Sequence, residues 1–249
     1  QGDIALTRHS ALERERLIRE APGLVDRMGY LFPIRKGQFP GKIAFNILLT
    51  LYDTLAGIKT HGWHNVASVQ QRAPGIRTNE LKGASYYTDA VTDDSRLVLR
   101  VLQQACSEGG QVINYVTAAQ LLRNNVGKVD GVTLHDNVTG KSLDLRANVV
   151  INATGAWVDN LRETVANERT IRPLRGSHII IPKEKIPIQD ALTLFHPVDK
   201  RATFIFPWEG FTVIGTTDLD HLPSLLEEPG ITRQEVDYLL QLAQDQFPD

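Results

Sequence analysis

Apolar residues recur at helical spacing in four long segments of the chain. The predicted helices cover residues 9–21, 42–57, 94–108 and 233–247. Ser10 followed by Glu13 resembles a capping box near the start of the first helix, and Pro22 with Gly23 ends it. Charged residues fill the faces that the apolar residues of this first helix leave free. Such a pattern is typical of a helix that packs on one side only.

The helix at residues 94–108 has signals at both ends. Asp93 and Asp94 stand at its start, and one of their carboxylates is expected to cap the first turn. Gly109 and Gly110 follow it and stop the helix. A further, shorter helix is expected to begin near Trp157.

The helix at residues 42–57 is unusually apolar. Its polar residues form one narrow stripe: Asn46, Thr50, Asp53 and Thr54. At ~1.5 Å per residue the helix is roughly 24 Å long, which is short for crossing a bilayer. Two interpretations are open: the helix is buried between two layers of the fold, or it lies in a membrane interface between basic anchors. The basic residues that flank it are Arg35, Lys36, Lys42 and Lys59.

Short β-rich runs separate these helices. A strand is expected at residues 29–34, and residues 111–121 are expected to form one strand that continues into a second. Residues 131–136 and 141–145 alternate around a turn and predict a hairpin. Residues 147–153 are almost wholly apolar, which is typical of a strand buried on both faces of a parallel sheet.

The last third of the chain predicts an antiparallel sheet. Its β-rich runs, separated by Pro, Gly and charged turns, are residues 178–181, 191–195, 203–206 and 211–216. The order of elements in the middle of the chain is typical of α/β folds that bind a ligand at the carboxyl ends of strands. We therefore predict an α/β fold.

Composition narrows the possible classes of function. Of 249 residues, 42% are hydrophobic and 22% charged, as in an ordinary globular protein. The formal net charge of −2 gives no electrostatic case for nucleic acid as the main partner. The single cysteine excludes a disulfide framework and makes a reducing compartment the default. The histidines show no metal-ligand spacing, so no metal site is predicted.

Two segments could carry chemistry. Residues 149–155 (VVINATG) end a predicted buried strand in a small residue, a hydroxyl and a glycine, which lets backbone approach a phosphate-bearing ligand. A tight strand–helix turn without a ligand is the alternative. His178 could accept a proton, because its unperturbed pKa lies near ~6.5, although most lone histidines are structural. Arg175 could bind an anionic substrate group or form an ordinary salt bridge.

Thr216 and Thr217 are the remaining candidates. They follow a predicted strand in the run GTTD, where their hydroxyls would either cap a turn or bind the polar edge of a ligand.

Taken together, the chain resembles the FAD-dependent glycerol-3-phosphate dehydrogenases of the aerobic, membrane-associated kind. Five blocks carry the resemblance, in the order of the family: residues 11–17 (ALERERL), 93–99 (DDSRLVL), 150–159 (VINATGAWVD), 176–182 (GSHIIIP) and 206–218 (FPWEGFTVIGTTD). The chain starts with Gln1 and contains only one methionine, Met28. The resemblance implies an internal fragment, with the strand and Gly-rich turn for the FAD pyrophosphate expected before Gln1 and a further segment after Asp249. It also implies little FAD affinity and no turnover for the isolated chain.

The resemblance divides the chain into three segments. Residues 1–88 would form a helical cap with a possible membrane contact through residues 42–57. Residues 89–165 would be part of a Rossmann-like FAD-binding domain. Residues 166–249 would be an antiparallel-sheet substrate domain that completes the cap.

The resemblance also assigns site residues. His178 would be catalytic, and Arg175, Thr216 and Thr217 would bind substrate. The residues that would contact FAD are Val116, through its backbone near the adenine, and Ala153, Thr154, Gly155 and Trp157.

The implied reaction is oxidation of sn-glycerol 3-phosphate to dihydroxyacetone phosphate, with electrons passed through FAD to quinone. The protein would be cytoplasmic and peripheral to the inner face of the cell membrane. An unpaired edge of the strand at residues 149–153 would favour a homo-oligomer. Two alternatives are a related FAD-dependent amino-acid oxidase and a non-catalytic domain that binds a membrane or a partner.

Overall fold

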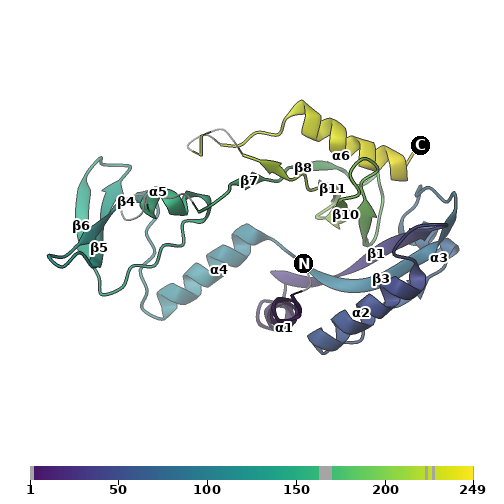
Figure 1. The fold of residues 1–249 in the computed structure, drawn as a ribbon, viewed down its shortest axis with the longest axis horizontal. Helices are drawn as coiled ribbons and strands as arrows, with labels where there is room; N and C mark the ends of the chain where they lie inside the picture. The colour runs from purple at the N-terminus through teal and green to yellow at the C-terminus, as the bar shows by residue number, and fades with distance from the viewer. Residues whose placement is uncertain (1–2, 163–169, 222–223, 226–227, 249) are drawn as a thin grey trace. The chain divides into compact units, whose positions relative to one another are not determined.

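The computed structural model describes residues 3–162, 170–221, 224–225 and 228–248. The chain divides into two compact units. The first contains residues 1–101, 176–218 and 231–249, and the second contains residues 102–175 and 219–230. Each unit is therefore built from separate stretches of the chain, and each is described by itself (Figure 1).

The first unit is organised around a seven-stranded sheet in the order β2-β3-β1-β9-β10-β11-β8. Neighbouring strands are antiparallel except β1 and β9, which are parallel. The strands are β1 (Val25–Arg35), β2 (Gly62–His64), β3 (Leu81–Thr92), β8 (His178–Pro182), β9 (Ala191–Phe195), β10 (Ala202–Trp208) and β11 (Phe211–Gly215). The β1–β9 pair joins the first third of the chain to the last third in one sheet.

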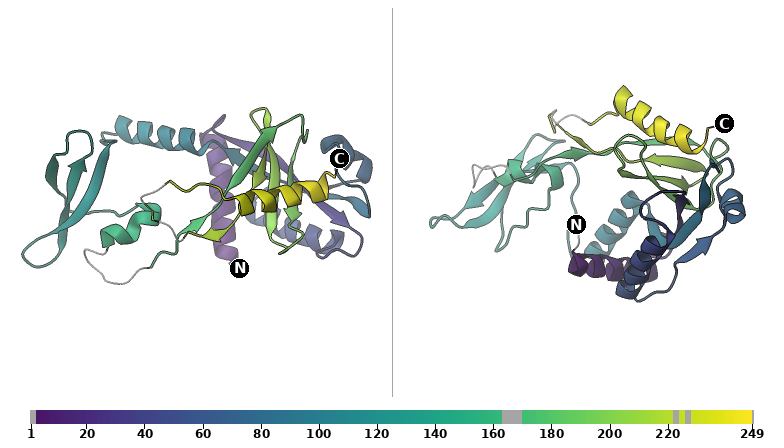
Figure 2. Two further views of the ribbon diagram at one scale, coloured as in Figure 1. Left: turned by 90° about the horizontal axis from the view of Figure 1, so that it is seen from above. Right: turned by 45° about the vertical axis from the view of Figure 1, so that its right-hand side comes forward.

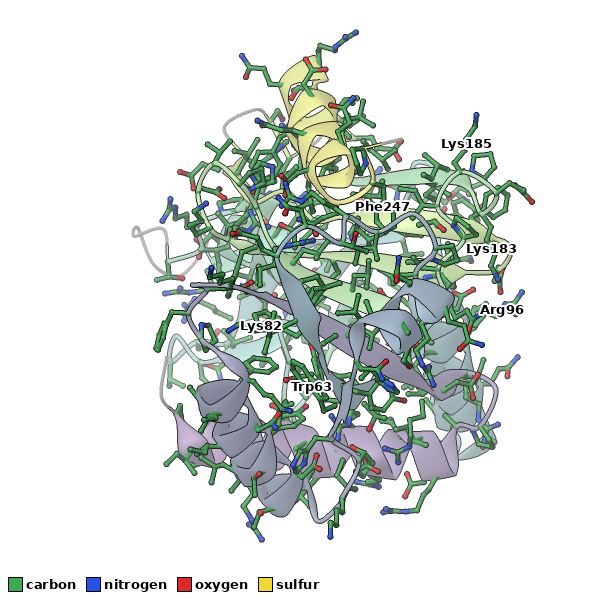
Figure 3. The ribbon with its side chains drawn as sticks, turned by 90° about the vertical axis from the view of Figure 1, so that its right-hand side faces the viewer. Trp63, Lys82, Arg96, Lys183, Lys185 and Phe247 are labelled. Atoms are coloured by element: carbon green, nitrogen blue, oxygen red, sulfur yellow. The ribbon has the colours of Figure 1, made fainter. Side chains whose placement is uncertain are left out.

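Helices pack on both faces of this sheet. One face carries the main apolar core together with α3 (Val66–Arg72) and α6 (Arg233–Gln246), which crosses the strands in Figure 2. Phe247, at the end of α6, packs against this core (Figure 3). Fully buried core residues include Leu31, Val69, Ile188, Leu192, Ile205, Ile214, Leu239 and Leu242.

The opposite face of the sheet meets α2 (Lys42–Ala56), and α1 (Ile4–Glu20) packs beside α2 (Figure 1). Phe45 of α2 stacks on Phe32 of β1 with ring centroids 4.2 Å apart. Phe32 points away from the core that holds its neighbour Leu31, because successive side chains of a strand alternate between faces.

The second unit contains two small sheets. β4 (Val116–Arg123), β5 (Val129–Asp136) and β6 (Ser142–Arg146) form an antiparallel meander, and β7 (Leu174–Arg175) pairs with β12 (Leu219–Asp220). Two short helical segments, η1 (Gly155–Trp157) and α5 (Val158–Arg162), follow the meander. The boundary between the units falls within α4 (Asp94–Ser107).

Several predicted elements are confirmed. α2, α4 and α6 agree with the predicted helices to within one residue at each end, and β9 agrees at both ends. The hairpin of β5 and β6 turns at residues 137–140 as expected. Asp93 caps α4 by accepting a hydrogen bond from Arg96 N at 3.1 Å.

The first helix begins earlier than predicted. α1 starts at Ile4, and Asp3 is its N-cap, accepting from Leu6 N at 2.9 Å. The Ser10–Glu13 capping box was therefore a wrong prediction. The apolar spacing became regular only after residue 9, whereas the polar capping residue lies six positions earlier in the chain.

The strand predicted at residues 147–153 is not formed. These residues have no strand conformation, and Val149 and Ile151 are 74% and 83% exposed. A central strand exists only if neighbours supply hydrogen-bonding partners on both edges, and no described strand pairs with this segment. Residues 111–115 are likewise not a strand, since β4 begins at Val116.

The orientation of α2 bears on the first interpretation of this helix, burial between two layers of the fold. Its polar stripe turns partly inward: Asp53 is 4% exposed, and Asn46 accepts a hydrogen bond from Ser85 of β3 at 3.2 Å. Asp53 also accepts from Thr60 N at 2.8 Å and faces His61 Nδ1 at 2.7 Å. An apolar face is left exposed, so the described residues do not enclose α2 between two layers. This face consists of Ile43, Ile47, Leu48 and Leu51.

The helices of the described residues are too short or too polar to cross a bilayer.

Candidate active site

His178 is held over a glycine at one end of the seven-stranded sheet. It begins β8 and pairs in register with Gly215 of β11. The imidazole lies so close to Gly215 that a Cβ on that residue would overlap the ring. Only a residue without a side chain at position 215 leaves room for the His178 ring where it lies.

Thr216 is placed by a second close approach. A Cβ on Gly176 would overlap Thr216 Oγ1, so only glycine leaves room for this hydroxyl. Thr216 Oγ1 donates to Thr217 O at 3.0 Å, and the Arg201 guanidinium donates to Thr216 O at 2.5 Å. Lone pairs of the Thr216 hydroxyl can still accept a hydrogen bond from a ligand.

His178 shares its face of the sheet with an aromatic cluster. His178, Gly215, Phe204 and Thr193 are paired in one row across four strands, and directly paired residues point to the same face. This face is opposite to the α6 core, which takes the alternate residues of these strands. The row ends beside Tyr87, whose hydroxyl lies 2.7 Å from Thr193 Oγ1.

Two tyrosines extend this face. Tyr30 stacks on Tyr87 at 5.2 Å and meets the edge of Phe204 at 6.0 Å. Burial raises the pKa of Tyr30 to about 12 and raises the pKa of Tyr87 as well, so both phenols stay protonated. No sequence motif points to these residues, because they come from strands that are far apart in the chain.

The electrostatics of His178 suit a proton acceptor. Although the side chain is partly exposed, partial burial lowers its pKa below the ordinary histidine value, because a low-dielectric environment disfavours the charged ring. A neutral imidazole near neutral pH has a free nitrogen lone pair.

Thr217 points into the protein. It is 4% exposed, accepts from Ser177 N at 2.9 Å, and donates to the buried carboxylate of Glu235 at 2.9 Å. Its predicted contact with substrate stays a prediction. Glu235 was not among the predicted site residues. Thr232 and Glu235 have the T-x-x-E spacing of a capping box, and the structure contains this capping box.

The predicted FAD residues of the NATG run form a tight turn in the second unit. Asn152 holds this turn: its amide donates to Val158 O at 3.0 Å, and its oxygen accepts from Thr154 Oγ1 at 2.8 Å. Gly155 has φ 58° and no atom within 4 Å of the place where a Cβ would lie. Ala153 and Gly155 are exposed, so backbone is accessible there.

Trp157 and Asp159 anchor the segment that follows this turn. Trp157 is 49% exposed, and its indole nitrogen donates to Leu225 O at 3.0 Å. Asp159 is 6% exposed and accepts from Ile171 N and Thr170 N, both at 2.8 Å. These backbone donors lower the pKa of Asp159.

Val116 and Arg175 also lie in the second unit. Val116 begins β4, an edge strand, so alternate backbone groups of β4 point away from β5. Arg175 is half-buried and pairs with Leu219 in the β7–β12 ladder. His178, Thr216 and Thr217 belong to the first unit. Within the part of the chain that the structure describes, acidic, His and Cys side chains form no metal-binding cluster.

Comparisons with known proteins identify the family. The model of the family described as FAD dependent oxidoreductase matches residues 2–249. The chain belongs to this family. It is also 31% identical over its whole length to an aerobic glycerol-3-phosphate dehydrogenase of Staphylococcus haemolyticus, and 30% identical to one of Staphylococcus aureus. The chain spans 45% of the length of each of these two family members.

Two solved structures have a similar fold. The glycerol-3-phosphate dehydrogenase from Bacillus halodurans, complexed with FAD, matches 99% of this chain and 44% of its own, with a TM-score of 0.77 and 26% identity. L-proline dehydrogenase from P. horikoshii matches 97% of this chain and 62% of its own, with a TM-score of 0.73 and 16% identity. The α/β fold class predicted from the sequence is thereby confirmed.

Proposed function

We propose that the protein that carries this chain oxidises sn-glycerol 3-phosphate to dihydroxyacetone phosphate with FAD as cofactor. The observation that carries this proposal is His178, a histidine with a lowered pKa beside Thr216 on the aromatic face of the sheet. The two staphylococcal relatives, which match the chain from end to end, support this choice of substrate.

The NATG turn fits a dinucleotide. The exposed Ala153 and Gly155 leave backbone accessible without a bulky side chain, and the positive φ of Gly155 suits a turn that faces a ligand. We propose that Ala153, Thr154, Gly155 and Trp157 contact FAD and that the free edge of β4 at Val116 contacts its adenine. FAD, when bound, supplies the acceptor for a hydride.

Residues of this chain would bind and orient the substrate and accept its hydroxyl proton. Neutral His178 would take the proton of the substrate hydroxyl while a hydride leaves the carbon that carries this hydroxyl. The alcohol thereby loses two electrons and two hydrogens and becomes a ketone. Thr216 accepts a hydrogen bond and orients the substrate. We propose Arg175 for the phosphate group, whose charge a guanidinium matches in bidentate fashion.

His178→Asn is expected to slow reduction of the bound flavin by glycerol 3-phosphate by about 10²–10⁴-fold, because a general base is lost. The measurement is stopped-flow bleaching of the flavin under anaerobic conditions. His9→Asn, at an exposed position of α1, is the matched control and should leave the rate unchanged. In the unaltered protein, kcat/KM should fall as pH drops through the lowered pKa of His178, because the protonated ring cannot accept a proton. Equal rates for the two variants would remove His178 from the mechanism.

The same assay tests the alternatives. Flavin bleaching by amino acids and not by glycerol 3-phosphate would favour an oxidase of the amino-acid branch. Absence of flavin from the purified protein, with no bleaching by either class of substrate, would favour a non-catalytic domain that binds a membrane or a partner.

We also propose that α2 rests in a membrane surface and that quinone there accepts the electrons. The exposed apolar residues of α2 continue to Phe39, which is 85% exposed just before the helix. Lys42 lies with its ammonium 4.2 Å from the ring of Trp63, a residue of β2 that is labelled in Figure 3. Lysine and tryptophan beside an apolar face are typical of helices at the headgroup level. The protein would then be peripheral on the inner, cytoplasmic face of the membrane.

Ile47→Glu is expected to lower binding to phosphatidylcholine vesicles that contain phosphatidylglycerol by at least about tenfold, because burying one isoleucine contributes about 1.5–3 kcal/mol. Co-sedimentation of the chain with vesicles measures this binding. Val198→Glu, at a position that is 66% exposed outside α2, is the control and should bind as the unaltered chain does. Equal losses for both variants would point to added charge in general and against an α2 contact.

The expected association of copies stays a prediction, although the argument given for it does not hold. It depended on an unpaired strand at residues 149–153, and the structure has no strand there.

A further inference from the structure

Glu235 is a buried carboxylate that the proposed reaction does not use. It lies in the first turn of α6, is 2% exposed, and forms the capping box with Thr232. Thr232 N and Thr232 Oγ1 donate to Glu235 Oε2 at 2.9 and 2.8 Å. One carboxylate oxygen is thus engaged in capping α6.

The other oxygen reaches out of the helix to two strand ends. Ser177 Oγ, one residue before β8, donates to Glu235 Oε1 at 2.8 Å, and Thr217 Oγ1, two residues after β11, donates to it at 2.9 Å. The two strand ends also bond each other, since Ser177 N donates to Thr217 Oγ1 at 2.9 Å and Thr217 N donates to Ser177 O at 3.2 Å. Glu235 therefore ties three elements together at one point.

This point adjoins the candidate active site on both strands. Ser177 precedes His178 in the chain, and Thr217 follows Thr216. The His178 ring and the Thr216 hydroxyl each fit against a glycine with no room for a methyl group. A small shift of either strand end would therefore move a reacting group.

The ionisation of the buried Glu235 carboxylate depends on its hydrogen-bond donors. Burial by itself raises the pKa of Glu235, but hydrogen bonds from Thr232, Ser177 and Thr217 outweigh it and lower the pKa to about 2. Glu235 is therefore ionised at neutral pH, and charge-assisted hydrogen bonds are short and directional. A capping box alone would not require bonds to two strands.

We propose that Glu235 is a positioning residue for the proposed active site: through Ser177 and Thr217 it fixes the strand ends that carry His178 and Thr216. This inference rests on the proposed function for the roles of these two groups. The positioning itself can be measured without flavin or substrate.

The decisive measurement is an NMR titration of the His178 ring in the chain and in its Glu235→Gln variant. If Glu235 positions the ring, the released imidazole becomes better hydrated, and its pKa rises toward the ordinary value of about 6.5. If Glu235 acted only through its charge, loss of that charge would lower the pKa of His178. A fall, or no change, would overturn the proposal.

Three further variants test whether a change in the His178 titration is specific to the Glu235 contacts. Asp237→Asn, at an exposed position of the same helix, is the matched control and should leave the His178 titration unchanged. Ser177→Ala removes one hydrogen bond to Glu235 but keeps the charge of Glu235, so it should raise the pKa of His178 by less than Glu235→Gln does. Ser177→Thr keeps a hydroxyl, so the pKa of His178 in this variant should stay close to its value in the unaltered chain. This pair remains informative if Glu235→Gln does not fold. An unchanged titration in Ser177→Ala would also overturn the proposal.

The flavin-containing protein provides a separate readout. Glu235→Gln should lower kcat. It should also move the acidic limb of the kcat/KM pH profile to higher pH, in parallel with the raised pKa of His178. If the unaltered protein fails to oxidise glycerol 3-phosphate, the proposed function is rejected, while the NMR titration still decides whether Glu235 positions the ring.

Discussion

Leu239→Ala is expected to lower the free energy of unfolding by about 2–5 kcal/mol, the largest effect of the substitutions considered. Leu239 is fully buried in the core between α6 and the seven-stranded sheet. Removing its side chain leaves a cavity and loses apolar burial, and the surrounding strands can collapse only partly. Urea unfolding followed by circular dichroism measures the change.

The neighbouring residue is the matched control. Leu240 has the same side chain in the same helix but is 37% exposed. Leu240→Ala should therefore cost less than about 1 kcal/mol, because alanine is also the better helix former. Similar losses for the two variants would show that α6 does not pack on the sheet through Leu239.

Gly215→Ala is expected to displace the His178 ring and to destabilise the fold by about 1–3 kcal/mol, as overpacking does. The added methyl group would occupy the position of the imidazole, so either the ring or β11 must move. The ring resonances of His178 in NMR spectra should shift strongly, and flavin reduction in the protein that carries this chain should fall.

Gly62→Ala provides the comparison for this variant. Gly62 lies in β2, with no atom within 4 Å of its missing Cβ and without a positive φ. Its replacement should leave both the His178 resonances and the stability nearly unchanged. An unperturbed His178 in Gly215→Ala would contradict the ring position described above.

The sequence predicted elements whose signals are local. α4 and α6 have an amphipathic pattern with a capping carboxylate or capping box at the start, and the turn of the β5–β6 hairpin lies in four consecutive residues. Such signals depend on spacing within one segment, so they survive without knowledge of the tertiary fold.

Predictions failed where a segment depends on distant partners. Residues 147–153 are apolar enough for a central strand, but a strand needs neighbours, and the described chain supplies none beside it. The long β3 was not predicted, although it pairs with β1 along the length of both strands. For α2 the pattern predicted the helix, but its polar stripe faces partly inward through Asp53 and Asn46.

The candidate site was predictable in part. His178 and Thr216 were predicted because each lies in a short sequence motif, GSH at residues 176–178 and GTTD at residues 215–218. Tyr87, Phe204 and Glu235 joined the site only through the sheet register and the packing of α6. No single segment of the sequence contains that information.

The parallel pairing of β1 with β9 has a consequence for synthesis. Leu31 lies beside Leu192, yet the ribosome makes β3 shortly after β1 and β9 much later. The nascent β1–β3 pair therefore waits with one open edge while residues 102–175 of the second unit are translated. During that interval this edge is the natural place for a chaperone to bind and for a neighbouring nascent chain to pair wrongly.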